Sequence, residues 1–182
     1  MELVTAARRR LLTVPAVTGY VGDKIFKYEI RATLPAVEPE QPGKELPRLS
    51  VLNGTGGRAV VVTSGNGWQV PEATGTAEFP TLQLQLWADC TRDEHGLKVA
   101  DDAVDKAYAL YRVVDKALNQ TRAEWWGAGG DNPGLWVLWC GRAAEPFHET
   151  ESDEHAMYST NSTVRLQDCA RVIVSYNIKT TH

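Results

Sequence analysis

A cysteine and a histidine lie close together in the chain, where an expected strand leads into an expected helix. Cys90 follows Asp89 directly, and His95 comes five residues after the cysteine. A histidine beside a cysteine can take its proton and leave a nucleophilic thiolate, so a small cytosolic enzyme could use Cys90 and His95. No further nucleophile motif accompanies them. We therefore favour a half-buried cysteine next to a solvated histidine, and we predict no catalytic residue and no enzyme activity.

A dense run of acidic and histidine residues lies before the last expected strand. A metal ion needs three or four such side chains to converge on one point. The run has neither a helical pair of histidines nor the acidic spacing of a calcium loop, so we predict no metal and no cofactor. We expect instead an exposed acidic loop over residues 148–158, mobile in an isolated subunit. The run consists of His148, Glu149, Glu151, Asp153, Glu154 and His155.

The segment Gly54–Gly57 resembles a phosphate-binding loop only in its glycines. It lacks the Lys and Ser/Thr that follow in such loops, and it leads into a strand rather than a helix. The glycines predict a hairpin turn instead, between a strand at Arg48–Leu52 and a return strand at Arg58–Thr63.

Four tryptophans lie within a short part of the chain. Trp125 and Trp126 are adjacent and precede a glycine-rich segment. Exposed indoles are enriched in protein–protein contacts, and for this adjacent pair we weigh an interface and a core position equally. Core packing is favoured for Trp136 and Trp139, although one face of a regular strand cannot hold both.

The composition excludes several classes of protein. The chain has 182 residues, of which 43% are hydrophobic and 23% are charged, as in an ordinary globular domain. The net charge of −4 argues against a protein that binds nucleic-acid phosphates directly. No apolar run approaches the roughly 20 residues of a membrane-spanning helix. Three cysteines without Cys-x-x-Cys spacing predict reduced thiols in a cytosol.

The first third of the chain predicts a helix, a pair of turns and a strand. An apolar stripe begins at Leu3, and Pro15 disfavours helical geometry at the residue before it, so we expect the helix to end at Val14. Glycines 19 and 22 then predict turns before an alternating strand at Phe26–Ile30. The proline-rich segment 33–47 predicts an exposed loop, which we also expect to be mobile.

A strand with two distinct faces is predicted at Phe79–Ala88. Leucines 82, 84 and 86 alternate with Gln83, Gln85 and Trp87. The leucines predict the core face. The other face carries no charge, which is unusual for a solvated sheet, so we predict that Gln83, Gln85 and Trp87 meet a neighbouring subunit.

The second half predicts a long helix over Val99–Leu118 and strands at Leu135–Cys140 and Val164–Lys179. The elements together predict an α+β fold, in which a mostly antiparallel β-sheet is covered on one face by two helices. We expect one domain over residues 1–182, with exposed loops at about 33–47 and 125–160.

The order of these elements resembles that of the tail terminator proteins of long-tailed bacteriophages, which are also called tail-completion or head–tail joining proteins. The resemblance lies in three segments: VTGYVGDKIF at 17–26, FPTLQLQLWAD at 79–89 and VADDAVDKAYALYRVVDKAL at 99–118. An alternating strand near the C-terminus completes the order. The Trp-rich and acidic segment from about 125 to 160 falls outside the resemblance.

The resemblance implies a structural protein of the virion tail or neck, assembled in the cytoplasm of a bacterial host. Copies would form a hexameric ring that caps the tail tube, terminates its polymerisation and joins the tail to the head connector. The implied partners are further copies of the chain, the major tail tube protein and the head–tail connector. Genomic DNA would pass through the ring without sequence-specific binding, and no membrane is involved. A head–tail connector or head-closure protein is the alternative within the same class. The candidate interface residues are Gln83, Gln85, Trp87, Trp125 and Trp126.

Overall fold

The computed structural model describes residues 2–28, 57–65, 68–72, 75–95, 98–120, 122–131, 133–152 and 167–180. A seven-stranded main sheet has the order β1-β2-β5-β11-β9-β8, and β10 also pairs with β11. β1 and β2 are parallel, and the other pairs of the main sheet are antiparallel. The main-sheet strands are β1 (Ile25–Lys27), β2 (Arg58–Ser64), β5 (Thr81–Asp89), β8 (Glu124–Trp126), β9 (Leu135–Arg142), β10 (Phe147–Ser152) and β11 (Gln167–Thr180).

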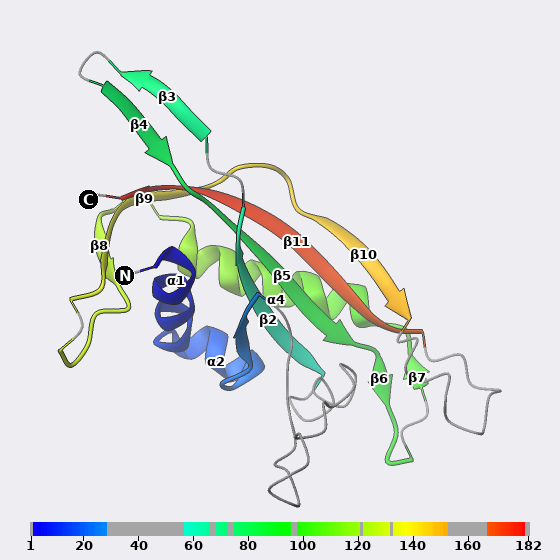
Figure 1. The fold of residues 1–182 in the computed structure, drawn as a ribbon. Coiled ribbons are helices and arrows are strands. Elements are labelled where there is room, and N and C mark those ends of the chain that lie inside the picture. Colours follow the sequence, from blue (N-terminus) through cyan, green and yellow to red (C-terminus); the bar gives the residue numbers. More distant parts are fainter. Residues whose placement is uncertain are drawn as a thin grey trace, which may run out of the picture.

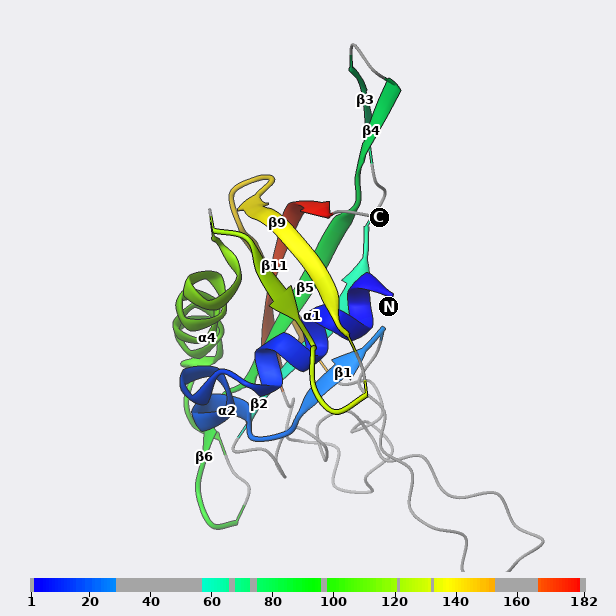
Figure 2. The same ribbon diagram turned by 90° about the vertical axis from the view of Figure 1, so that its left-hand side faces the viewer.

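The helices lie against one face of this curled sheet (Figures 1 and 2). They are α1 (Leu3–Leu12), α2 (Pro15–Val21) and α4 (Ala103–Leu118). The predicted α+β class is therefore confirmed, and the described residues contain one more helix than expected. Within the described part of the chain, none of the helices has the length and apolar character to cross a membrane.

The extra helix, α2, begins at the residue that was expected to end helical structure. Val14 has extended backbone angles, and Pro15 occupies the first position of α2. Proline suits that position because its missing N–H has no partner in the first turn of a helix. The prediction of turns around Gly19 was wrong, whereas Gly22 ends α2 with a positive φ of 59°.

The core lies between the helices and the central strands β5 and β11. Leucines 82, 84 and 86 of β5 are fully buried, as predicted. On β11, Val172, Val174, Tyr176 and Ile178 are buried in the same core, and Ala170 is buried in a separate small cluster. α4 contributes a buried stripe that includes Ala107, Leu110, Val114 and Leu118. Tyr176 Oη also donates a hydrogen bond of 2.9 Å to Asp115 Oδ1, which fixes α4 on β11.

Helix α1 bridges the two terminal strands of the curled sheet. Arg8 Nε donates a hydrogen bond of 2.5 Å to the carbonyl oxygen of Ile25 in β1. Arg10 Nε lies 2.9 Å from Glu124 Oε1 in β8. The same helix contacts β1, β2 and β8, so both ends of the sheet order are packed against α1.

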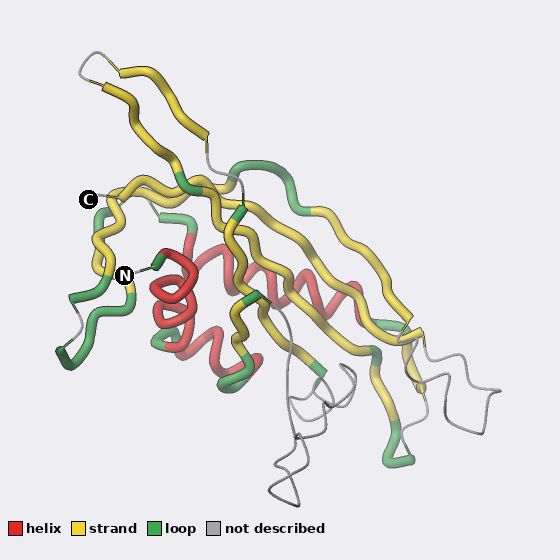
Figure 3. The backbone as a smooth tube through the Cα atoms, viewed as in Figure 1, coloured by secondary structure: helices red, strands yellow, loops and turns green. Residues whose placement is uncertain are grey.

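A hairpin projects beyond the main sheet (Figures 1 and 3). It consists of β3 (Trp68–Glu72) and β4 (Gly75–Phe79), which form a two-stranded sheet of their own. A second short sheet is formed by β6 (Thr91–Arg92) and β7 (Lys98–Ala100). The sequence pattern predicted neither sheet. Val99 belongs to β7 and is 61% exposed, so its expected place in the long helix was wrong.

Two expected loops are partly strand. β8 and β10 fall in the segment 125–160 that was expected to be exposed loop, and β10 includes the first residues of the expected acidic loop. β10 is held by antiparallel pairing with β11, for example His148 with Val172. The proline-rich loop 33–47, the strand at Arg48–Leu52 and the acidic residues from Asp153 to Tyr158 lie outside the described residues. Arg58–Thr63 is confirmed as a strand, in β2, but β2 pairs with β1 and β5 and not as the return strand of the expected hairpin.

Candidate interaction surfaces

The face of the main sheet that points away from the helices, called the outer face here, is organised around Arg171 of β11. Arg171 Nε donates a hydrogen bond of 2.8 Å to Glu149 Oε2 on β10, and Arg171 Nη1 lies 3.3 Å from Gln85 Oε1 on β5. The same guanidinium lies over the indole ring of Trp87, 5.1 Å from its centroid. One always-charged side chain thus joins three strands across the outer face.

This arrangement changes the surface that was predicted from Gln83, Gln85 and Trp87. Trp87 is only 2% exposed and packs with Ala59 and Val61. Gln83 and Gln85 are partly exposed. A partner that approaches this face would therefore meet the two amides and the Arg171–Glu149 pair rather than the indole. Alternation along one strand correctly predicted that Trp87 points to the outer face. It could not predict the contact between Trp87 and Arg171, because that contact depends on the register of β5 and β11.

The adjacent tryptophans divide between the core and the surface. Trp126 is fully buried, and its indole Nε1 donates a hydrogen bond of 2.9 Å to Glu124 Oε1. Trp125 is 54% exposed, and its ring centroid lies 5.1 Å from that of Trp136 on the paired strand. Of the two equally weighted interpretations, a core position therefore holds for Trp126, and Trp125 is available at the surface.

Trp136 and Trp139 share the outer face because β9 is irregular between them. Trp139 pairs with Lys179, and the next pair is Val137 with Thr180, so Leu138 is an extra residue. Cys140 and Val137 are both fully buried on the helix side, which places Trp136 and Trp139 on the other side. An extra residue of this kind shifts the alternation by one position. The expectation that one face cannot hold both indoles was wrong for this reason.

Trp125 and Trp136, whose rings are in contact on paired strands, form an aromatic surface at one end of the sheet, which we call the indole patch, and Trp139 lies farther along β9. Trp139 is 37% exposed. Its ring lies over Gly141, where an added Cβ would overlap the indole. The glycine therefore allows the indole to lie flat along β9. Large exposed aromatic groups of this kind often mark sites of protein association.

The structure places Cys90 and His95 in different surroundings. Cys90 is buried in a small cluster with Ala103 and Ala170. His95 lies exposed after β6, with Nε2 3.5 Å from Glu94 Oε1. The cysteine therefore has the packing role that the sequence favoured for it, and Asp89 is also buried at this junction.

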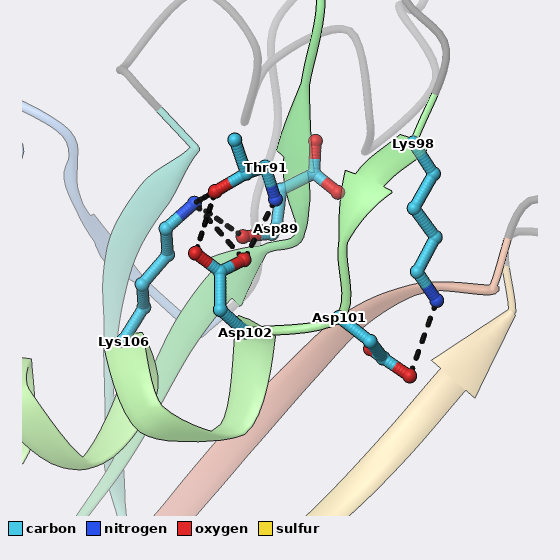
Figure 4. A network of polar contacts seen from close by, with 6 residues as sticks. All are labelled: Asp89, Thr91, Lys98, Asp101, Asp102 and Lys106. Carbon is cyan, nitrogen blue, oxygen red and sulfur yellow. Dashed lines mark hydrogen bonds and ion pairs between the residues drawn. The ribbon is translucent and has the colours of Figure 1, made fainter.

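A polar network at the same junction fixes the start of α4 (Figure 4). The Thr91 backbone N–H and hydroxyl donate hydrogen bonds of 2.7 and 2.5 Å to the carboxylate of Asp102. Lys106 Nζ lies 3.4 Å from the same carboxylate and 3.3 Å from the carbonyl oxygen of Asp89. Partial burial alone would raise the pKa of Asp102, but these hydrogen bonds and the lysine charge hold it below its usual value. The network is a structural clamp between β6 and α4.

The described part of the acidic run contributes contacts to the fold. His148 Nδ1 lies 3.4 Å from the hydroxyl of Tyr108, and the two rings meet edge to face. Glu149 is held by Arg171. Across the described ranges, no three His, Cys, Asp or Glu residues are grouped so that they could hold a metal ion. Asp153, Glu154 and His155 lie outside the described residues.

All three cysteines are buried. Burial raises the pKa of Cys140 to about 12, because the apolar surroundings disfavour the thiolate. The thiol of Cys140 is therefore protonated at neutral pH and acts as a small apolar group.

In the comparisons with known proteins, the similarity that we find is one of structure. No protein-family model and no curated protein matches the chain. Among solved structures, the fold is similar to that of a chain in the virion of a native gene transfer agent particle. That match has a TM-score of 0.50 and 14% sequence identity, and it covers 98% of this chain and 93% of the other. At this identity the likeness concerns the fold.

Proposed function

We propose that this protein is a structural component of a phage-like virion, and that within the virion it is a tail terminator. The observation that carries the proposal is the likeness of fold to a chain of a gene transfer agent virion along 98% of this chain. The match spans nearly the whole of both chains, so the entire architecture is compared and not one common motif. The resemblance of three sequence segments to tail terminators gives the finer role.

In the proposed role, copies of the chain form a hexameric ring at the end of the tail tube. One face of the ring binds the last ring of the tube protein and stops further addition, and the other face meets the head–tail connector. DNA passes through the central opening. The net charge of −4 suits a channel protein that does not hold the phosphates, because strong binding would need clustered Lys and Arg.

The surfaces described above support a role in binding other protein subunits rather than a role in catalysis. The indole patch provides exposed aromatic groups, and the outer face offers amides and an ion pair between Arg171 and Glu149. Such mixtures of aromatic and arginine side chains are enriched in interfaces. Cys90 and His95, the residues of the alternative enzyme hypothesis, lie in different surroundings.

Loss of the protein tests the role. If it ends tube growth, particles produced without it should have overlong or variable tails that are not joined to filled heads. Polymerisation depends on the tube protein alone, so tubes should still form. Tails of normal length joined to heads would exclude the terminator role. Normal-length tails that are detached from heads would favour a connector or head-closure protein instead.

A further inference from the structure

Strand β10 forms an open edge of the main sheet. Among the described strands it pairs only with β11, in a regular ladder that runs from the pair Phe147–Ile173 to the pair Glu151–Cys169. Figure 1 shows no described helix or strand on the far side of β10. The side chains at positions 147–150 are all exposed. One long side of β10 therefore carries backbone groups that no described strand engages.

The hydrogen bonds of β11 show which backbone groups point to each of its two sides. The N–H of Ile178 donates to the carbonyl oxygen of Pro80, and the register with β5 is continuous, so the even-numbered residues of β11 direct their N–H and C=O groups toward β5. The odd-numbered residues face the opposite side. This is seen in the bond of 2.7 Å from the N–H of Ala143 to the carbonyl oxygen of Ser175.

The register of β10 on β11 extends this alternation to the open edge. Phe147 and Glu149 lie opposite odd-numbered residues of β11, so they direct their N–H and C=O groups toward β11. His148 and Thr150 occupy the alternate positions and direct theirs away from the sheet. Donors and acceptors at this spacing match the backbone of another extended strand. The ligand that fits the open edge is therefore an extended polypeptide segment.

The side chains beside the open edge define that segment further. Phe147 and Glu149 lie on the outer face, and Phe147 is 53% exposed. Both hydrogen bonds from Arg171 to Glu149 end on Oε2, so Oε1 can accept a bond from a partner. The fullest overlap of two β10 strands would be centred on Glu149 and would place two carboxylates directly opposite each other, which is destabilising. Charge complementarity therefore favours a different strand with a basic side chain at this position.

We propose that β10 binds an extended strand of a different protein, which adds to the main sheet with a basic residue beside Glu149 and an apolar residue beside Phe147. Backbone bonds to His148 and Thr150 hold the strand, and the two side chains on the outer face set its register. The inference rests on the proposed function, in which the protein that supplies the strand is the tube protein.

The other two edges of the main sheet offer less to a new strand. β1 and β8 have only three residues each, and both contact α1. Arg8 bonds to Ile25 in β1, and Arg10 pairs with Glu124 in β8. These edges are shorter than β10 and are tied to a helix, whereas the regular ladder of β10 extends over residues 147–151.

Hydrogen exchange at single-residue resolution tests the contact on the full chain, first alone and then bound to tail tubes. In the free protein the amide of Glu149 should exchange slowly because it bonds to β11, whereas the amides of His148 and Thr150 should exchange quickly. On tubes, exchange at these two outward amides should slow by about tenfold or more, because each gains a backbone acceptor.

A matched pair of variants measures the same contact by affinity. Thr150→Pro removes an outward N–H and no bond to β11, and proline is tolerated at such positions of an edge strand. It should weaken binding to tubes by about tenfold or more, whereas Thr150→Val keeps the N–H and should bind like the unmodified protein. Circular dichroism checks that both variants are folded, and the exchange measurement on the unmodified chain does not depend on them.

Each outcome decides a separate point. Tube binding with unchanged exchange at His148 and Thr150, or normal binding by folded Thr150→Pro protein, would overturn the contact while the terminator role remains. Slowed exchange in concentrated protein without tubes would assign the edge to a second copy and would also overturn it. Equal exchange of Glu149 and its two neighbours in the free protein would overturn the strand geometry behind the proposal. Protein that does not bind tubes would overturn the contact and the role together.

Discussion

Replacement of each of the two adjacent tryptophans by alanine should lower stability by very different amounts. Trp126 is fully buried among core residues, so Trp126→Ala removes a whole indole from a packed interior. Such substitutions cost about 3–5 kcal/mol. The variant also loses the 2.9 Å hydrogen bond from Nε1 to Glu124, a contribution of about 0.5–1.5 kcal/mol. The free energy of unfolding of a typical domain is only about 5–15 kcal/mol in total, so the variant should be close to unfolding.

Trp125→Ala should cost much less, because the side chain is 54% exposed. Its main contact is with the ring of Trp136 at 5.1 Å, and aromatic pairs of this kind contribute about 0.5–1.5 kcal/mol. The pair of variants is matched in residue type and position in the chain. Any difference between them therefore reports burial rather than the chemistry of tryptophan.

Urea unfolding followed by far-ultraviolet circular dichroism gives the free energy of unfolding of each variant by linear extrapolation. We expect the Trp126→Ala variant to lose at least about 2 kcal/mol more than the Trp125→Ala variant, from the three ranges above. Equal losses, or a larger loss for Trp125→Ala, would refute the assignment of Trp126 to the core and of Trp125 to the surface.

Three further perturbations follow from particular sites. Asp102 has a pKa below its usual value, so its contribution to the free energy of unfolding is complete above the pKa of the unfolded chain and is lost as the pH falls through the folded pKa. The Asp102→Asn variant should therefore be less stable at neutral pH, and its stability should depend less on pH below about 4. Burial raises the pKa of Cys140 to about 12, so iodoacetamide at pH 8 should leave that thiol unlabelled in the folded protein and label it after unfolding, as measured by peptide mass spectrometry. Rapid labelling of Cys140 in the native state would contradict its burial. Gly22 has a φ of 59°, whereas Gly19 lies within α2. In thermal melts, Gly22→Ala should therefore destabilise the protein by about 1 kcal/mol and Gly19→Ala should stabilise it by about 0.4–1 kcal/mol. The reverse order would contradict the backbone conformations of the two glycines.

The sequence predicted the central elements because their periodicity is long and regular. The leucines of β5 and the buried stripe of α4 each repeat over several turns or pairs, so tertiary context cannot easily override them. α2 was missed because Pro15 was treated as the end of a helix, although proline also suits the first position of a new one. A single residue type therefore had two opposite structural meanings.

The remaining strands depend on partners that a local pattern does not contain. β8 has only three residues and β10 is largely polar, so neither shows a useful alternation, and pairing with β9 and β11 forms them. The same limit applies to the surfaces. The extra residue at Leu138 brings Trp136 and Trp139 to one face, and the burial of Trp87 beside Arg171 requires the register of two strands. Alternation along one strand indicates toward which face of the sheet a side chain points, but how far that side chain is exposed to solvent depends on the neighbouring strands.

The most direct test of the central claim is electron cryomicroscopy of tail tubes incubated with the purified full-length protein. The tubes should be made from the major tail tube protein of the same phage-like particle. The account predicts a closed ring of copies at one end of each tube, the end that meets the head in complete particles, and tubes that no longer grow when more tube protein is added. Tubes without density at either end that continue to lengthen at the same rate would contradict it.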